Sequence, residues 1–100
     1  MRSYADEHID TLFHAILTLK DVEECYRFFE DVCTIPELKE LGVRLEVARL
    51  LKSGEKYSEI CNRTGTSTAT ISRVNKCLQY GSGGYNLVLD RLESKESEEE

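Results

Sequence analysis

The stretch from Tyr57 to Tyr80, YSEICNRTGTSTATISRVNKCLQY, governs how the rest of the chain is interpreted. It predicts two short helices, 57–64 and 67–80, joined by a turn at Gly65, because glycine adopts the positive φ that such turns require. The inward positions of these helices are apolar or small: Ile60, Cys61, Ile71 and Val74. The spacing therefore predicts a helix-turn-helix over residues 57–80.

The outward face of the second helix carries hydrogen-bonding and cationic side chains, the distribution that a helix placed in a DNA major groove needs. Arg73 is expected to contact a base, because arginine–guanine pairs are the commonest specific contact, and Lys76 to contact a phosphate. Ser67 is expected to cap the helix in any case. The candidate DNA-contacting residues are Arg63, Thr66, Ser67, Thr68, Ala69, Thr70, Ser72, Arg73 and Lys76.

The charge of the chain is unevenly distributed. The 100 residues carry a net charge of −6, which argues against a generally basic nucleic-acid-binding protein. Between Cys61 and Leu89, however, there are three cations and no Asp or Glu, so this window carries +3 and the remainder −9. A neutral-to-basic face on an acidic body is compatible with DNA binding, because the local potential governs phosphate contacts.

The sequence before this stretch predicts three further helices. A single apolar stripe that includes Ile9, Phe13 and Ile16 indicates the first of them. Thr34 and Glu37 form a capping box at the start of the third, which Gly54 is expected to end. We predict an all-α protein of about six helices, 5–20, 22–33, 35–53, 57–64, 67–80 and 85–93, with one domain over residues 1–93 and an acidic, disordered tail over 94–100.

Several classes of protein are disfavoured by what the sequence lacks. No apolar run is long enough to span a membrane and the N-terminus has no secretory signal, so we expect a cytoplasmic protein. The four cysteines form no CxxC pair and are expected to be reduced and mostly buried, and no metal site is expected. No activated nucleophile or glycine-rich phosphate loop is present, so we expect no catalytic residues.

From Thr34 to Leu92 the sequence resembles the Trp repressor-like family, in a small and poorly characterised branch that is distinct from the tryptophan repressors. The resemblance rests on Leu41-Gly42-x-Arg44, on Leu50-Leu51-x-x-Gly54-Glu55, and on Gly65 followed by Ala69-Thr70-Ile71-Ser72-Arg73.

The resemblance implies an intertwined homodimer in which the first helices of both chains form a shared core. A two-fold dimer would place its two reading helices in successive major grooves of double-stranded DNA, about 34 Å apart. We therefore expect a sequence-specific transcriptional regulator, and specifically a repressor. The overall charge of −6 keeps an alternative open, a helical protein–protein adaptor that retains the fold without DNA binding.

The resemblance also implies a small-molecule pocket, to which Thr34, Arg44 and Arg73 correspond. Tryptophan repressors have a glycine after the second arginine, where this chain has Val74, and a serine at the position of Cys77. The branched Val74 side chain should occupy the space of an indole, so we expect no tryptophan cofactor. Either the protein binds DNA without a ligand, or another small effector fits the possible pocket of Thr34, Arg44, Arg73, Val74 and Cys77.

Overall fold

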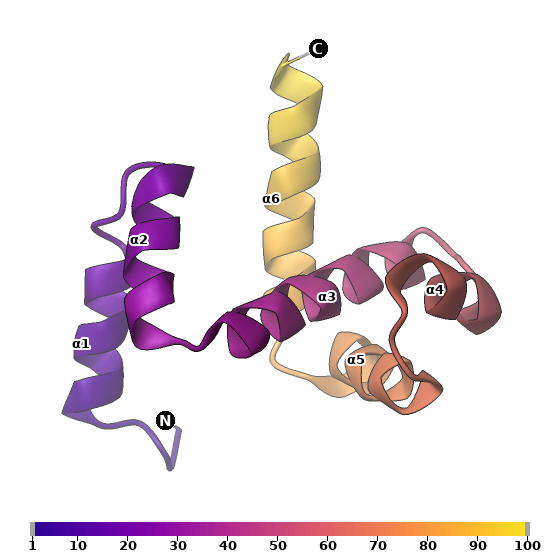
Figure 1. Ribbon diagram of the computed structural model, residues 1–100, viewed down its shortest axis with the longest axis horizontal. Helices are drawn as coiled ribbons and strands as arrows, with labels where there is room; N and C mark the ends of the chain where they lie inside the picture. The colour runs from indigo at the N-terminus through magenta and orange to yellow at the C-terminus, as the bar shows by residue number, and fades with distance from the viewer. Residues whose placement is uncertain (1, 100) are drawn as a thin grey trace. The chain divides into compact units, whose positions relative to one another are not determined.

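A computed structural model describes residues 2–99, with the side chains of residues 2–97. Over this range the protein consists of six helices and no strand (Figure 1), which confirms the predicted all-α class. The chain divides into two compact units, residues 1–38 and 39–100. The single domain over 1–93 stays a prediction. The helices are α1 (Glu7–Ile16), α2 (Val22–Val32), α3 (Ile35–Lys52), α4 (Tyr57–Thr64), α5 (Thr68–Tyr80) and α6 (Gly84–Glu99).

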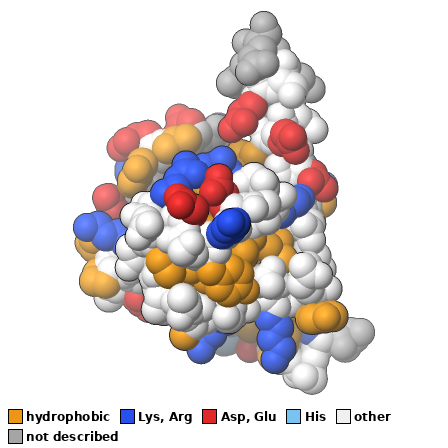
Figure 2. All heavy atoms as spheres, turned by 90° about the vertical axis from the view of Figure 1, so that its right-hand side faces the viewer, with side chains coloured by type: hydrophobic (Ala, Val, Ile, Leu, Met, Phe, Trp, Pro, Cys, Tyr) orange, Lys and Arg blue, Asp and Glu red, His pale blue; other side chains and the backbone are white. Residues whose placement is uncertain are grey.

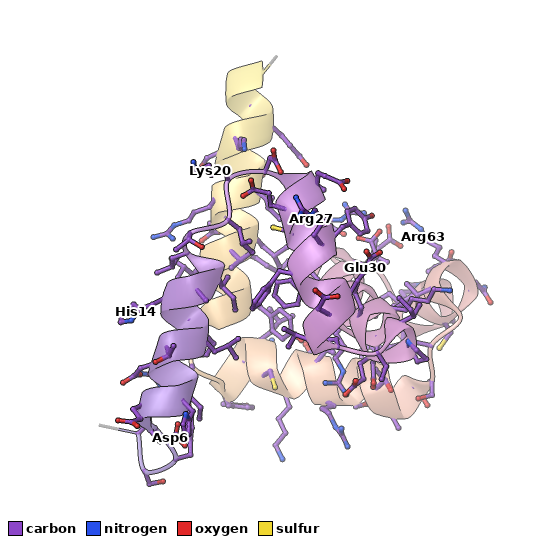
Figure 3. The ribbon with its side chains drawn as sticks, turned by 60° about the vertical axis from the view of Figure 1, so that its left-hand side comes forward. Asp6, His14, Lys20, Arg27, Glu30 and Arg63 are labelled. Atoms are coloured by element: carbon purple, nitrogen blue, oxygen red, sulfur yellow. The ribbon has the colours of Figure 1, made fainter. Side chains whose placement is uncertain are left out.

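Helix α1 is shorter than the predicted helix over 5–20. It begins after Asp6, labelled in Figure 3, whose carboxylate accepts a hydrogen bond from the Ile9 amide at 2.8 Å. It ends early because the amides of Thr18 and Leu19 each donate to the carbonyl oxygen three residues before, at 3.1 Å. Such tight bonds satisfy the last carbonyl groups and close the helix.

The next two helices begin as the sequence predicts. The Asp21 carboxylate accepts from the Glu24 amide at 2.8 Å, and Glu24 accepts from the Lys20 amide at 2.9 Å. The Thr34 hydroxyl accepts from the Glu37 amide at 3.2 Å, while the Glu37 carboxylate accepts from the Thr34 amide at 2.9 Å, which confirms the capping box. The hydrogen bond from the Thr34 amide, followed by the interaction with the Thr34 side chain, lowers the pKa of the Glu37 carboxyl.

The unit of residues 1–38 has no buried core of its own within the described residues. Helices α1 and α2 contain no buried side chain, and Leu17 is 80% exposed. Phe28 and Phe29 pack edge to face, with ring centroids 5.4 Å apart. The exposed large apolar side chains here are Tyr4, Phe13, Leu17, Val22, Tyr26, Val32 and Ile35. These apolar side chains therefore remain exposed when the unit is considered by itself.

The unit of residues 39–100 is built around one apolar core. Its buried members come from all four helices of the unit: Val47, Ala48 and Leu50 of α3, Ile60 of α4, Ile71 and Val74 of α5, and Leu89 of α6. The predicted inward positions Ile60, Ile71 and Val74 are therefore confirmed, whereas Cys61 is only half-buried. Burial of these side chains provides the main stabilisation of the unit.

Glycines define the boundaries between the helices of this unit. Gly54 follows α3 with φ of +89°, and Gly65 ends α4 with φ of +72°, as predicted. Gly42 lies inside α3, and a Cβ at this position would meet no atom within 4 Å beyond its chain neighbours and the adjacent backbone of its own helix.

The last helix is longer than predicted, because α6 runs from Gly84 to Glu99 rather than over 85–93. No Gly or Pro follows Gly84, and Leu, Glu and Lys are good helix formers. Residues 94–99 of the expected disordered tail therefore continue the helix, while Glu100 lies outside the described residues.

Replacing Gly65 and Gly42 with alanine should change the free energy of unfolding in opposite directions. Gly65→Ala should lower the free energy of unfolding by about 1–2 kcal/mol, because an L-residue is strained at positive φ. Gly42→Ala should raise it by about 1 kcal/mol, because alanine favours a helix interior. Urea denaturation measures both. A destabilising Gly42→Ala would contradict the open surroundings of Gly42 and indicate that a second molecule packs there.

Candidate nucleic-acid interface

Hydroxyl groups hold the turn between α4 and α5. The Thr64 hydroxyl donates to the Ile60 carbonyl oxygen at 2.7 Å and accepts from the Thr66 amide at 3.3 Å. The Ser67 hydroxyl accepts from the Thr70 amide at 3.2 Å and lies 3.2 Å from the Thr70 hydroxyl. Ser67 is therefore the predicted N-cap of α5, and two of the candidate hydroxyls, those of Ser67 and Thr70, are engaged within the turn.

Helix α5 has one buried side and one exposed side. Ile71 and Val74 face the core, together with the half-buried Leu78. Ala69, Arg73 and Lys76 are exposed, and their spacing of four and three residues places them on one line along the opposite side of the helix. We call these three residues the reading ridge. The structure thus brings together three of the predicted DNA-contacting residues, with Thr68 and Ser72 exposed beside them.

Tyr80 continues the reading ridge to the end of α5, four residues after Lys76, and is 84% exposed. It was absent from the residues selected from the sequence. Its spacing from Lys76 places it on the same line, and this signal was available without the structure.

The two cations of the reading ridge differ from four other cations of the unit of residues 39–100. Arg44, Arg49, Lys52 and Arg63 each lie within 4 Å of a carboxylate. No such partner is found for Arg73 or Lys76 among the residues that the structure describes. The positive charge of the ridge is therefore available to an external anion.

Arg63, also a predicted DNA-contacting residue, has a different environment. It belongs to α4 and is labelled in Figure 3. Its Nη1 lies 3.5 Å from Oε1 of Glu55. Arg49 bonds Glu46 through two nitrogens, at 2.6 and 2.9 Å. This bond, with the charges of Arg49 and Arg63, lowers the pKa of the Glu46 carboxyl. On the side of the protein turned to the viewer in Figure 2, basic and acidic side chains lie next to each other, which reduces their net field.

The residues of the possible effector pocket have different local environments. Arg44 donates from Nη2 to Glu40 at 2.8 Å, and its Nε is buried without a partner among the described residues. Val74 is 2% exposed and belongs to the core, whereas Cys77 is exposed. Thr34 lies in the other unit and caps α3. The Val74 side chain therefore occupies the volume that a glycine at this position would leave open.

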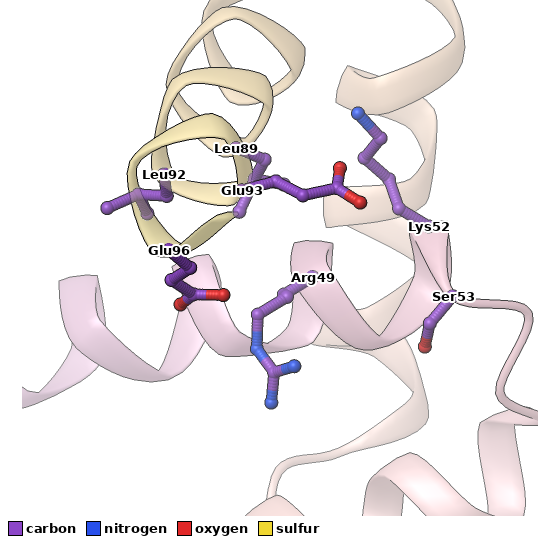
Figure 4. Close-up of a pocket in the computed structure, with 7 residues that line it drawn as sticks. All are labelled: Arg49, Lys52, Ser53, Leu89, Leu92, Glu93 and Glu96. Atoms are coloured by element: carbon purple, nitrogen blue, oxygen red, sulfur yellow. The ribbon is translucent and has the colours of Figure 1, made fainter. Parts of the chain in front are cut away.

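Two hollows among the described residues lie elsewhere, against α6. The first has a volume of about 300 Å³ between α3 and α6 (Figure 4). The second is shallow and is formed by α6 alone. Neither includes Arg44 or Val74. The first hollow is lined by Arg49, Lys52, Ser53, Leu89, Leu92, Glu93 and Glu96.

The four cysteines are free thiols, but Cys25 and Cys77 are exposed and Cys33 and Cys61 only half-buried, so the predicted burial of most of them is wrong. No group of three or more potential ligands among residues 2–99 is placed to hold a metal ion. None of the described helices has the length and apolar character needed to cross a membrane.

Comparison with known proteins defines the class of this helix-turn-helix protein. The sequence profile of the family described as Trp repressor protein matches residues 7–93. The chain therefore belongs to the Trp repressor family, which is a regulatory DNA-binding fold.

Three relatives place the chain more closely within this family. The uncharacterized Bacillus subtilis protein YerC is 55% identical over 92 residues, which cover 92% of this chain and 88% of YerC. A TrpR-like protein from Eubacterium eligens is 53% identical with a TM-score of 0.85, over 87% of this chain and 90% of that one. A candidate Trp repressor from Staphylococcus aureus is 48% identical with a TM-score of 0.86, over 89% of each chain. The predicted Trp repressor-like branch is confirmed.

Tryptophan should not bind this protein. Isothermal titration calorimetry with millimolar tryptophan should give no binding heat, because the buried Val74 side chain occupies the space beside α5. A saturable isotherm with the unchanged protein would contradict this reasoning. Val74→Gly provides the comparison, since it removes only the side chain that blocks the space, and thermal unfolding shows whether this variant is folded.

Proposed function

We propose that the protein is a homodimeric, sequence-specific DNA-binding transcriptional regulator, and specifically a repressor, acting in the cytoplasm. The observation that carries this proposal is the reading ridge, where Arg73 and Lys76 project from α5 without a described carboxylate partner. Since DNA binding depends on cations that are free to meet phosphates and base edges, this surface suits a major groove.

The candidate residues take different roles in this proposal. Arg73 contacts a base edge and Lys76 a phosphate, as their exposed positions on the ridge permit. Thr68 and Ser72 offer exposed hydroxyls beside the ridge. The Ser67 and Thr70 hydroxyls hold the turn, so their contribution is to position the helix, and the amides at the start of α5 favour a phosphate near Thr66 and Ser67. Arg63 reaches DNA only by leaving Glu55.

The proposed dimer follows from the apolar surface of residues 1–38. Phe13 of α1, Leu17 at its C-cap and Tyr26 of α2 are exposed, and neither helix has a buried side chain. Two copies that join these faces form the core that one copy lacks. No effector is required in this proposal, because the buried Val74 side chain occupies the volume beside α5 and Arg44 is paired with Glu40.

Removing the Arg73 side chain should separate DNA binding from folding. We expect Arg73→Ala to weaken binding to a selected duplex about 5- to 150-fold, because one arginine–base contact contributes about 1–3 kcal/mol. Fluorescence anisotropy with labelled duplex measures this. Arg91→Ala, which removes an exposed cation from α6 instead, is the matched control and should bind as the unchanged protein does. Equal affinities for the two variants would remove Arg73 from the interface.

The protein should sediment as a dimer, and the apolar face of α1 should maintain it. Phe13→Lys places a charge where the partner would pack, so we expect the monomer to predominate in sedimentation velocity. Thr11→Lys adds the same charge to the same helix, two residues away on an exposed position, and should leave the dimer intact. A monomeric unchanged protein would contradict the dimer directly.

The acidic overall charge favours one other function, a helical protein–protein adaptor that retains the fold. Genomic fragment selection separates the two. Enrichment of defined duplexes supports the regulator, whereas a folded dimer that enriches no fragment supports the adaptor.

A further inference from the structure

We propose that α5 reads two base types in its operator: Ala69 contacts the 5-methyl group of a thymine, and Arg73 contacts a guanine about two base pairs away. This inference rests on the proposed function and specifies the sequence that the same surface recognises. It is carried by the chemistry of the side chains that the first two turns of α5 expose.

The start of α5 lacks the side chains that read adenine and cytosine. No Asn, Gln, Asp or Glu occurs between Thr64 and Val74, although amides are the usual partners of adenine and carboxylates of the cytosine amino group. The Thr70 hydroxyl, which could bind several bases, is 3.2 Å from the Ser67 hydroxyl and is engaged there. The first turn of α5 therefore offers few side chains that can form hydrogen bonds with base edges.

Ala69 supplies an apolar contact at this position. It is exposed on the second residue of α5 and is the first member of the reading ridge. Its methyl group lets the helix backbone approach a base pair closely, and thymine is the one base that presents a methyl group in the major groove. Thr68 also carries a methyl group, but it lies beside the ridge, a quarter-turn or so away from Ala69.

Arg73 fixes the second base. It follows Ala69 by four residues, which is about 6 Å along the helix axis. Stacked base pairs are about 3.4 Å apart, so a helix lying along the groove places these two side chains about two base pairs apart. Arg73 has no carboxylate partner among the described residues, and guanine offers it two acceptors, O6 and N7.

The test begins with a pool of duplexes that have a randomised centre, selected by the full-length protein. The enriched duplex is then synthesised in three forms: with its thymines, with deoxyuridine in place of single thymines, and with 7-deazaguanine in place of single guanines. Deoxyuridine removes only the methyl group. At one position we expect this change to weaken binding about fourfold, the value for one buried methyl-sized group, and 7-deazaguanine two base pairs away to weaken it about tenfold.

Protein variants assign each effect to a residue. Ala69→Gly should bind the thymine and deoxyuridine duplexes equally, and Arg73→Ala should lose its preference for guanine over 7-deazaguanine. Because each comparison is between two duplexes with one variant, a general loss of helix stability cancels. Gln79→Gly, an exposed position of α5 off the ridge, is the control for glycine in the helix and should keep both preferences.

The outcomes separate this inference from the proposed function. If no duplex is enriched, the proposed DNA binding itself is contradicted. If a duplex is enriched but no thymine shows a deoxyuridine effect, or if the effect persists in Ala69→Gly, the assignment of Ala69 is overturned while DNA binding stands. An effect that disappears only in Ala69→Gly supports the inference.

Discussion

The packing of Ile71 and Val74 against the core is the interaction that fixes the orientation of α5, and the proposed recognition surface depends on it. A helix that buries one line of side chains must expose the opposite line, so these two residues set the rotation of α5 about its axis. Arg73 and Lys76 face outward as a direct consequence. Burial of two apolar side chains thereby positions two cationic side chains that form no ion pair among the described residues.

The availability of charge distinguishes the cations of this protein more sharply than their number does. Arg49 and Arg63 lie close to Glu46 and Glu55, and such exposed pairs contribute little to stability but reduce the field that a phosphate would meet. The absence of acidic residues between Cys61 and Leu89 leaves α5 outside this pairing. An acidic protein can therefore present a local cationic surface without a high overall charge.

The two units differ in how much apolar surface they bury. Residues 39–100 bury side chains from four helices, whereas α1 and α2 leave theirs exposed although their caps at Asp6 and Asp21 are well formed. Local capping specifies where these helices begin, but a helix gains most of its stability from covering its apolar face. In the proposed dimer, a second chain covers that apolar face.

The sequence alone determined the features that depend on neighbours along the chain: the all-α class, the caps at Asp21 and Thr34, the turn at Gly65 and the buried positions of α5. These follow from spacing and from local hydrogen bonds. Only the tertiary structure decided that Arg63 meets a carboxylate, that Gly42 is open and that the cysteines are not buried, because these depend on groups brought together by folding. The DNA-contacting roles stay predictions, since they depend on a partner outside the chain.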